Sequence, residues 1–213
     1  STTLMELDTL PQRLIIVGGG YIGLEFAAMY ANYGSMVTVL EYGTDFLPRE
    51  DRDIANVIQT RLEALGIRLV FNAQVEEITD ENDQTTVGYL DRSSGDHVTL
   101  PADAVLIATG RKASTAELDL EAAGVKMNER GEIIVNELLQ TNVPHIWALG
   151  DVKGGLQFTY ISLDDSRIIK DQLWGDGKRT ATNRGPIPYS MFLDPVFARV
   201  GLNETEALQA GHK

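Results

Sequence analysis

The chain reads RLIIVGGGYIG from Arg13 to Gly23, and this stretch determines the fold class. Residues 13–17 are mostly apolar and β-branched and end at glycines, which is typical of a parallel strand buried on both faces. From Tyr21 to Tyr33 apolar side chains recur at three- and four-residue steps, which predicts a helix that Gly34 can end in a left-handed conformation. This order of strand, glycine turn and helix predicts a binding site for the phosphates of a dinucleotide.

The glycines of this stretch have the spacing of a phosphate-binding turn. Gly18 permits a tight turn after the strand, Gly20 lets the backbone approach a pyrophosphate, and Gly23 lets the helix pack closely on the strand. Backbone amides and the positive end of the helix dipole then face the phosphates, so Tyr21 and Ile22 belong to the predicted site as well. Glycine-rich turns also occur by chance, and the elements that follow therefore decide between the two interpretations.

A second strand and helix follow the first pair. Residues 36–40 read MVTVL and predict a strand. An apolar stripe at helical spacing, closed by Gly66, predicts the helix. The stripe consists of Ile54, Val57, Ile58, Leu62 and Leu65. The first turn of this helix is expected to hold three acidic residues, which are Glu50, Asp51 and Asp53.

Glu41 lies at the carboxyl end of the second predicted strand, roughly twenty residues beyond the glycine loop. A carboxylate at this place can accept hydrogen bonds from both hydroxyls of an adenine ribose and would repel a 2′-phosphate. The position therefore favours NAD(H) over NADP(H). Two alternatives stay open: Glu41 is a solvated carboxylate at a strand end, or Arg49 supports NADP(H) if its loop folds back.

The pattern changes after a third predicted strand at 67–71. Three alternating segments predict an antiparallel meander, at 75–79, 85–90 and 97–100, with polar turns at 80–83 and 93–96. Residues 104–108 again read as a doubly buried strand, which ends at Thr109-Gly110-Arg111. The predicted fold class is α/β, with a Rossmann-like parallel sheet and an antiparallel three-stranded meander.

The remainder of the chain has weaker patterns. Short apolar runs predict strands at 133–135 and 145–149. A helix is expected at 159–173, with four apolar residues facing inward: Ile161, Ile168, Ile169 and Leu173. Residues 175–188 have the composition of a linker, a new element starts at 196–200, and a helical pattern covers 203–209.

Composition narrows the class of protein further. The 213 residues are 43% hydrophobic and carry a net charge of −13 that is spread along the chain, which is typical of a soluble globular protein and disfavours nucleic acid as a partner. The absence of cysteine excludes disulfides and thiol chemistry within this stretch, and the three histidines lack metal-ligand spacing, so no metal site is expected. No apolar run could span a membrane and the start is not a signal sequence, so a cytoplasmic location is expected.

Two further motifs follow the glycine loop: VLIATGR at 105–111 and IWALGDV at 146–152. Together with GGGYIGLE at 18–25, they resemble the pyridine nucleotide-disulfide oxidoreductases, which include glutathione reductase, dihydrolipoamide dehydrogenase and mercuric reductase. The run at 156–165 is most similar to a bacterial branch that is related to mercuric reductase and associated with resistance to reactive chlorine species.

The resemblance implies three domain pieces and a set of FAD-binding residues. Residues 1–111 would be the NAD(P)H-binding domain, 112–183 the carboxyl-terminal segment of the FAD-binding domain, and 184–213 the truncated start of the dimerisation domain. The residues implied around FAD are Gly110, Gly150, Asp151 and Thr159. Asp151 would accept hydrogen bonds from the ribityl chain of FAD, although a helix N-cap is an alternative role. Thr159 would present its backbone near the flavin at a helix start.

Two residues resemble catalytic positions of the family. Tyr21 resembles the tyrosine that lies over the flavin and moves aside for nicotinamide; a packed loop aromatic is the alternative. Glu25 resembles a helix acid that pairs with a lysine near the flavin, which would lie upstream of this chain. Without that lysine, Glu25 is expected to be solvated.

The implied activity of the full-length protein is hydride transfer from NAD(P)H to FAD and onward to a disulfide or another acceptor, in a homodimer. The redox cysteines, the FAD pyrophosphate loop and the acid-base residues of the family would lie outside this stretch, so the fragment alone is expected to be inactive. Two other functions stay open. One is a flavin NADH oxidase or metal-ion reductase without a redox disulfide, and the other is a non-catalytic NAD-binding module.

Overall fold

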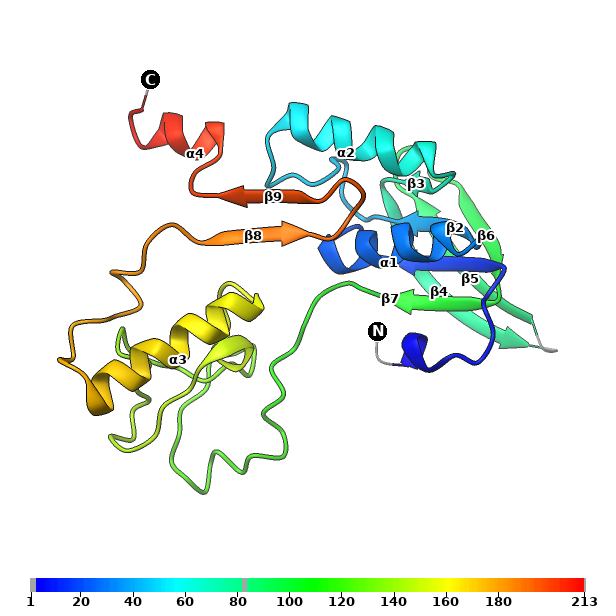
Figure 1. Ribbon diagram of the computed structural model, residues 1–213. Helices are drawn as coiled ribbons and strands as arrows, with labels where there is room; N and C mark the ends of the chain where they lie inside the picture. The colour runs from blue at the N-terminus through cyan, green and yellow to red at the C-terminus, as the bar shows by residue number, and fades with distance from the viewer. Residues whose placement is uncertain (1–2, 82–83, 213) are drawn as a thin grey trace. The chain divides into compact units, whose positions relative to one another are not determined.

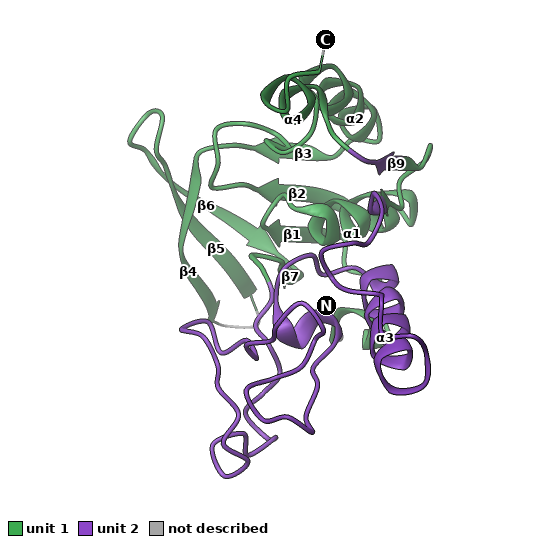
Figure 2. Cartoon of the chain, turned by 90° about the vertical axis from the view of Figure 1, so that its left-hand side faces the viewer, with its two compact units in different colours: residues 1–110, 190–197, 202–213 green, residues 111–189, 198–201 purple. Residues whose placement is uncertain are grey.

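The computed structural model describes residues 3–81 and 84–212, and Figure 1 shows the elements along the chain. The chain divides into two compact units (Figure 2). Unit 1 comprises residues 1–110, 190–197 and 202–213, and unit 2 comprises residues 111–189 and 198–201. Among the described residues, no helix has the length and apolar character needed to cross a membrane.

A four-stranded parallel sheet lies at the centre of unit 1, with the strand order β3-β2-β1-β7. Its strands are β1 (Arg13–Val17), β2 (Met36–Leu40), β3 (Arg68–Val70) and β7 (Ala104–Ile107). β1 pairs in parallel with both β2 and β7. The predicted bounds of β1 and β2 are confirmed. Their backbone hydrogen bonds run to neighbouring strands, as in any parallel ladder.

Both faces of β1 are covered. Leu14 and Ile16 belong to a core with helices α1 (Tyr21–Asn32) and α2 (Arg52–Ala64), whereas Ile15 belongs to a second core with the antiparallel meander. In Figure 2, the meander and α1 accordingly lie on opposite sides of the parallel sheet. This double burial explains why the strand reads as a continuous apolar run. The predicted helix from Tyr21 is confirmed, and Gly34 follows it with a φ of 103°.

The prediction for α2 was wrong in two details. The helix begins at Arg52, so Glu50 and Asp51 precede its first turn and only Asp53 lies in it. Its buried row is Ala55, Ile58 and Leu62, while Ile54 and Val57 are exposed. The apolar stripe of the sequence mixes two neighbouring rows of the helix, and the small side chain of Ala55 lies on the row that packs against the core.

The meander is confirmed, with longer strands than expected. It consists of β4 (Ala73–Glu81), β5 (Gln84–Asp91) and β6 (His97–Ala102) in the order β4-β5-β6. The predicted turn at 80–83 was wrong at its start, because the ladder to β5 continues to Glu81; residues 82–83 lie outside the described residues. The turn at 93–96 is confirmed, since it joins β5 to β6. Val87 and Tyr89 of β5 form the meander side of the second core.

The prediction that residues 104–108 form a doubly buried strand was partly wrong. Leu106 is buried, but the side chain of Ile107 is 53% exposed. β7 stands at the end of the strand order, next to β1. Side chains of a strand at the edge of a sheet are less buried than those of a central strand, and the apolar pattern of the sequence does not indicate which place a strand takes.

Unit 2 contains one long helix, α3 (Thr159–Trp174), and a short 3-10 helix, η2 (Gly150–Lys153). The prediction of α3 is confirmed, and Ile161 and Ile168 are buried, but Leu173 is 44% exposed and does not face inward. The segment after α3 has no helix or strand up to Pro188, as its linker composition predicts.

The strands predicted at 133–135 and 145–149 were wrong. Only isolated bridges occur there in the described part of the chain, between Met127 and Ile133 and between Gln140 and Trp147. Their backbone groups bond instead across loops, as when the N–H of Ala148 donates to the carbonyl of Leu139. A short apolar run becomes a strand only beside a partner strand, and these runs pack into a small core around Val125, Ile133 and Ala148.

The last part of the chain forms a two-stranded sheet and a short helix. The elements are β8 (Pro188–Met191), β9 (Phe197–Val200) and α4 (Glu204–Gln209); η1 (Thr3–Glu6) lies near the start of the chain. These confirm a new element at 196–200 and a helix within 203–209. Asn203 caps α4, since its side chain accepts the N–H of Glu206 while the Glu206 carboxylate accepts the N–H of Asn203.

We expect the core contacts of α2 to dominate its contribution to stability. Leu62 is 1% exposed and Leu65 on the same helix end is 40% exposed. Leu62→Ala is therefore expected to lower the free energy of unfolding by about 2–5 kcal/mol, because it removes buried atoms and leaves a cavity. The matched change Leu65→Ala should cost about 1 kcal/mol or less. Urea unfolding followed by circular dichroism measures both, and equal losses would contradict the packing described for α2.

Candidate functional site

The glycine loop between β1 and α1 has two crowded positions and one open position. Gly18 has a φ of 107°, and a Cβ added there would lie 2.6 Å from the carbonyl oxygen of Ala108. A Cβ added to Gly23 would lie 2.1 Å from the carbonyl oxygen of Gly18. At Gly20, by contrast, an added Cβ would meet no atom within 4 Å. The loop is therefore closed tightly at both ends and leaves its middle open to an approaching group.

The open position coincides with the start of α1. Gly20 is the N-cap residue of this helix and is exposed, and it supplies no side-chain hydrogen bond to the first turn. The first turn also contains no acidic side chain that would neutralise the helix dipole. Tyr21 and Ile22 follow as the first two helical residues and are half-buried. The N-terminus of α1 thus has the character of an anion site.

Glu41 directly follows β2 and reaches back to the glycine loop. Its Oε2 accepts the N–H of Gly19 at 2.7 Å, and its Oε1 accepts the N–H of Gly43 at 2.7 Å. The carboxylate is half-buried, so the alternative of a simply solvated Glu41 was wrong. Each carboxylate oxygen can accept further hydrogen bonds, because an ionised carboxylate has about four lone-pair sites. Glu41 is therefore held beside the loop with acceptor capacity to spare.

A second carboxylate, Glu50, contacts the loop from the segment between β2 and α2. Its side chain is 4% exposed, and its Oε1 accepts the hydroxyl of Tyr21. No sequence pattern indicates this contact, and Glu50 was expected only as an acid in the first turn of a helix. It lies in irregular backbone, where spacing does not predict which way a side chain points.

The structure also places three further residues of unit 1 that the sequence analysis named. Glu25 on α1 is half-buried, and its Oε1 accepts the backbone N–H of Phe192 at 2.9 Å, in an exposed place. Gly110 is exposed, with a φ of 143°. Arg49 is exposed, and its carbonyl accepts a hydrogen bond from the side chain of Asn203 at 3.1 Å.

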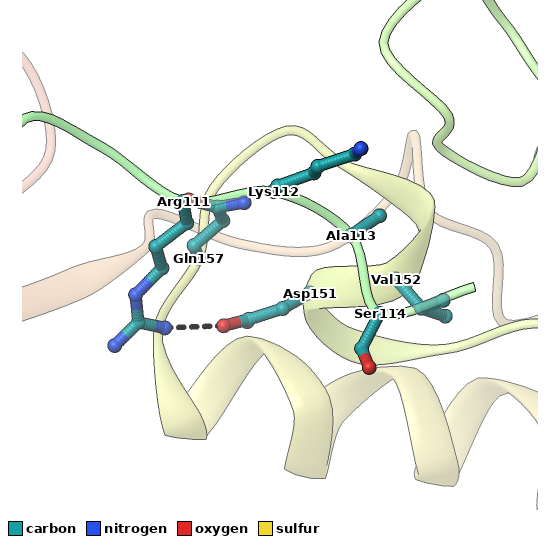
Figure 3. Close-up of a pocket in the computed structure, with 7 residues that line it drawn as sticks. All are labelled: Arg111, Lys112, Ala113, Ser114, Asp151, Val152 and Gln157. Carbon is teal, nitrogen blue, oxygen red and sulfur yellow. Dashed lines mark hydrogen bonds and ion pairs between the residues drawn. The ribbon is translucent and has the colours of Figure 1, made fainter. Parts of the chain in front are cut away.

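Unit 2 has a pocket of about 370 Å³ beside η2 (Figure 3). Its lining residues are Arg111, Lys112, Ala113, Ser114, Asp151, Val152 and Gln157. Figure 3 shows the Asp151 carboxylate directed at the guanidinium of Arg111, with which it forms an ion pair. Asp151 is not a helix N-cap, because Leu149 occupies that position of η2, so the N-cap alternative was wrong. Sequence reasoning did not predict the ion pair between Arg111 and Asp151, which are 40 positions apart in the chain.

A buried ion network holds the backbone that carries Asp151. Asp165 on α3 is 0% exposed and accepts the N–H of Gly150 at 2.9 Å. The same carboxylate contacts the Nζ of Lys153 at 3.2 Å and the guanidinium of Arg184 at 2.6 Å. A buried carboxylate requires such partners, because an unpaired buried charge is costly. These contacts fix the position of Gly150, which has a φ of 71°, against α3.

Thr159 is the first residue of α3, as predicted for a helix start, and it is exposed. The preceding residue, Phe158, stacks on Tyr160 and on Tyr189, with ring centroids 5.7 Å and 5.2 Å apart. These aromatic contacts fix the backbone at the N-terminus of the helix. The predicted residues therefore form two groups: the glycine loop with Glu41 in unit 1, and the η2 turn with the start of α3 in unit 2.

Comparison with known proteins gives consistent matches. A family model described as "Pyridine nucleotide-disulphide oxidoreductase" matches residues 1–166. The probable pyridine nucleotide-disulfide oxidoreductase RclA of Escherichia coli (strain K12) is 51% identical over 211 residues, which are 99% of this chain and 46% of that protein. The mercuric reductase of Staphylococcus aureus is 36% identical over 212 residues, which are 100% of this chain and 38% of that protein.

Solved structures agree with these relatives. The structure described as "HOCl-induced flavoprotein disulfide reductase RclA from Escherichia coli" aligns with a TM-score of 0.90 and 50% identity, over 98% of this chain and 46% of that chain. The chain spans about half the length or less of the curated relatives named above, which are oxidoreductases. Because the family model covers most of the sequence and the fold agrees, the chain belongs to the pyridine nucleotide-disulphide oxidoreductase family.

Proposed function

We propose that this chain is the nicotinamide-dinucleotide-binding portion of a longer FAD-dependent disulfide oxidoreductase, together with part of its FAD-binding domain. The family implies FAD and a pyridine nucleotide as cofactors. The observation that carries the proposal is the arrangement at the start of α1. An open, uncapped helix N-terminus lies beside the Glu41 carboxylate, which is held by the N–H of Gly19. The helix N-terminus suits a pyrophosphate, and the Glu41 carboxylate suits the hydroxyls of a ribose.

The pyridine nucleotide is NADH in this proposal. The loop from Gly18 to Gly23 would bind the pyrophosphate through backbone amides, and Glu41 would accept hydrogen bonds from the adenine-ribose hydroxyls. Both Glu41 oxygens are already fixed by backbone N–H groups, so the carboxylate would not retreat from an added 2′-phosphate. Repulsion between the two negative groups disfavours NADPH.

FAD would be held in part by residues of unit 2. The carboxylate of Asp151 at the edge of the pocket suits the hydroxyls of a ribityl chain, since these are donors and the carboxylate is an acceptor. Gly110 would leave room for the cofactor, Gly150 would carry the turn that presents Asp151, and the N-terminus of α3 at Thr159 would stabilise negative charge on the reduced ring. When bound, FAD supplies the two-electron chemistry that accepts hydride from NADH.

The proposed division of roles follows the family domains: NAD(P)H binding by 1–111, FAD binding by 112–183, and the start of a dimerisation domain at 184–213. Tyr21 would move aside for the nicotinamide, and Glu25 would pair with a lysine supplied by the remainder of the flavin domain. We favour a disulfide as acceptor because the relative with 51% identity is described as a disulfide oxidoreductase, whereas the relative described as a mercuric reductase is 36% identical. A homodimer and a cytoplasmic location stay predictions.

Cofactor preference tests the assignment of Glu41. In the full-length flavoprotein, the wild type should bind NADH more tightly than NADPH. Glu41→Gln should narrow this preference by about tenfold, because the amide no longer repels a 2′-phosphate and accepts ribose hydroxyls less well. Titration of both cofactors measures the effect, and Asp45→Asn, an exposed carboxylate of the same segment, is the control. Equal losses for both cofactors, or tighter NADPH binding by the wild type, would refute the assignment.

Flavin retention tests the assignment of Asp151. Asp151→Ala should weaken FAD binding by about tenfold to a hundredfold, because hydrogen bonds to a charged acceptor are lost at about 1.5–3 kcal/mol. The measurement is the ratio of flavin to protein absorbance after dialysis, together with the dissociation constant for added FAD. Asp176→Ala, a change to an exposed carboxylate of the same unit, should leave both values unchanged. Full retention of FAD by the Asp151 variant would contradict the role.

A further inference from the structure

Glu50 is a buried carboxylate that neither the proposed NADH contacts nor the proposed FAD contacts use. It lies outside the helices and strands, between β2 and α2, and its side chain is 4% exposed. A carboxylate removed from water needs strong donors, and the hydroxyl of Tyr21 is one of them. Tyr21 is also the first residue of α1, inside the glycine loop. The structure thus links a fixed acid to the loop that would bind the dinucleotide.

The acceptor side of this bond is held rigidly. The backbone N–H of Glu50 donates to the carbonyl of Leu47 at 3.0 Å, and the Arg52 guanidinium donates to the carbonyl of Glu50 at 2.9 Å. The same guanidinium donates to the carbonyl of Phe46 at 2.8 Å and to that of Leu47. Phe46 and Leu47 are themselves buried in the core. The backbone of Glu50 is therefore fixed, and its buried carboxylate can follow a departing hydroxyl only as far as rotation of its own side chain allows.

Tyr21 is the side chain that would have to move. Its ring is half-buried and packs at the edge of the main core, and it follows Gly20, where the loop faces open space. If the ring moves aside for the nicotinamide, its hydroxyl must leave the fixed Glu50 carboxylate. The bond then stabilises the resting position, and the apparent affinity for NADH is lowered by the small fraction of molecules in which the ring has moved.

We infer that Glu50 is a positioning residue that holds Tyr21 in its resting position, so that NADH binding must break the Tyr21–Glu50 hydrogen bond. This inference rests on the proposed NADH site and adds to it a hydrogen bond that must break before NADH binds. Removal of an ordinary contact to the cofactor weakens NADH binding, whereas removal of the Tyr21–Glu50 bond tightens it. A hydrogen bond to a charged acceptor is strong enough to shift the affinity by about tenfold.

The test uses the full-length flavoprotein and stopped-flow reduction of its flavin by NADH. The NADH concentration at half-maximal rate and the limiting rate are measured for the wild type, Tyr21→Phe, Glu50→Gln and the double variant. Tyr21→Phe should lower the half-saturating NADH concentration about tenfold. Glu50→Gln should lower it less, because a neutral amide oxygen still accepts the hydroxyl. The double variant should equal Tyr21→Phe, since both changes remove one interaction.

Tyr33→Phe is the matched control, because Tyr33 lies at the other end of α1 and is exposed; it should leave both parameters unchanged. Weaker NADH binding by Tyr21→Phe, or additive effects in the double variant, would overturn the inference about the Tyr21–Glu50 bond. A purely structural Glu50 would lower the melting temperature in Glu50→Gln without changing the half-saturating concentration, which would also overturn it. Failure of the proposed function is distinguishable: the wild-type flavin would not be reduced by NADH, or Glu41→Gln would not change cofactor preference.

Discussion

The burial of β1 on both faces is the constraint on which unit 1 depends. Leu14 and Ile16 pack toward the helices and Ile15 packs toward the meander, so a shift by one residue would turn each set toward the opposite core and disrupt the packing of both. The carboxyl end of β1 is thereby fixed next to that of β2, where the N–H of Gly18 donates to the carbonyl of Leu40 at 2.8 Å. The position of the glycine loop, and of Glu41 beside it, follows from this register.

The chain carries a net charge of −13, and three acidic side chains near the glycine loop and along α1 are each held by hydrogen bonds. Glu41 accepts backbone N–H groups with both oxygens, Glu50 accepts a phenol, and Glu25 accepts the N–H of Phe192. In these contacts, each carboxylate accepts a hydrogen bond from an uncharged donor of the protein itself. A site with this arrangement keeps the positive end of α1 for an incoming anion.

The sequence was sufficient for the elements of unit 1 and insufficient for much of unit 2. β1 and β2 are short runs rich in apolar and β-branched residues and α1 has helical spacing, and their predicted bounds agree with the structure to within one residue. The strands expected at 133–135 and 145–149 failed because a strand depends on its neighbour, and pattern alone cannot supply one. In the site, glycine spacing and strand ends predicted the loop and Glu41. Sequence reasoning did not predict the contacts of Glu50, Arg111 and Asp165, because their partners lie far away in sequence or in irregular backbone.

The ion network around Asp165 has a consequence for how this part of the family can vary. Arg184 reaches the buried carboxylate from the far end of the segment that follows α3, while Gly150 and Lys153 reach it from η2. The intervening residues 175–183 must be long enough for Arg184 to return, and Arg179 among them pairs with Asp164 at 2.6 Å. A homologue that loses Arg184 leaves Asp165 with less positive charge around it, and is expected to have replaced Asp165 as well, because an incompletely paired buried charge is costly. The two positions should covary as a unit even though 19 positions separate them.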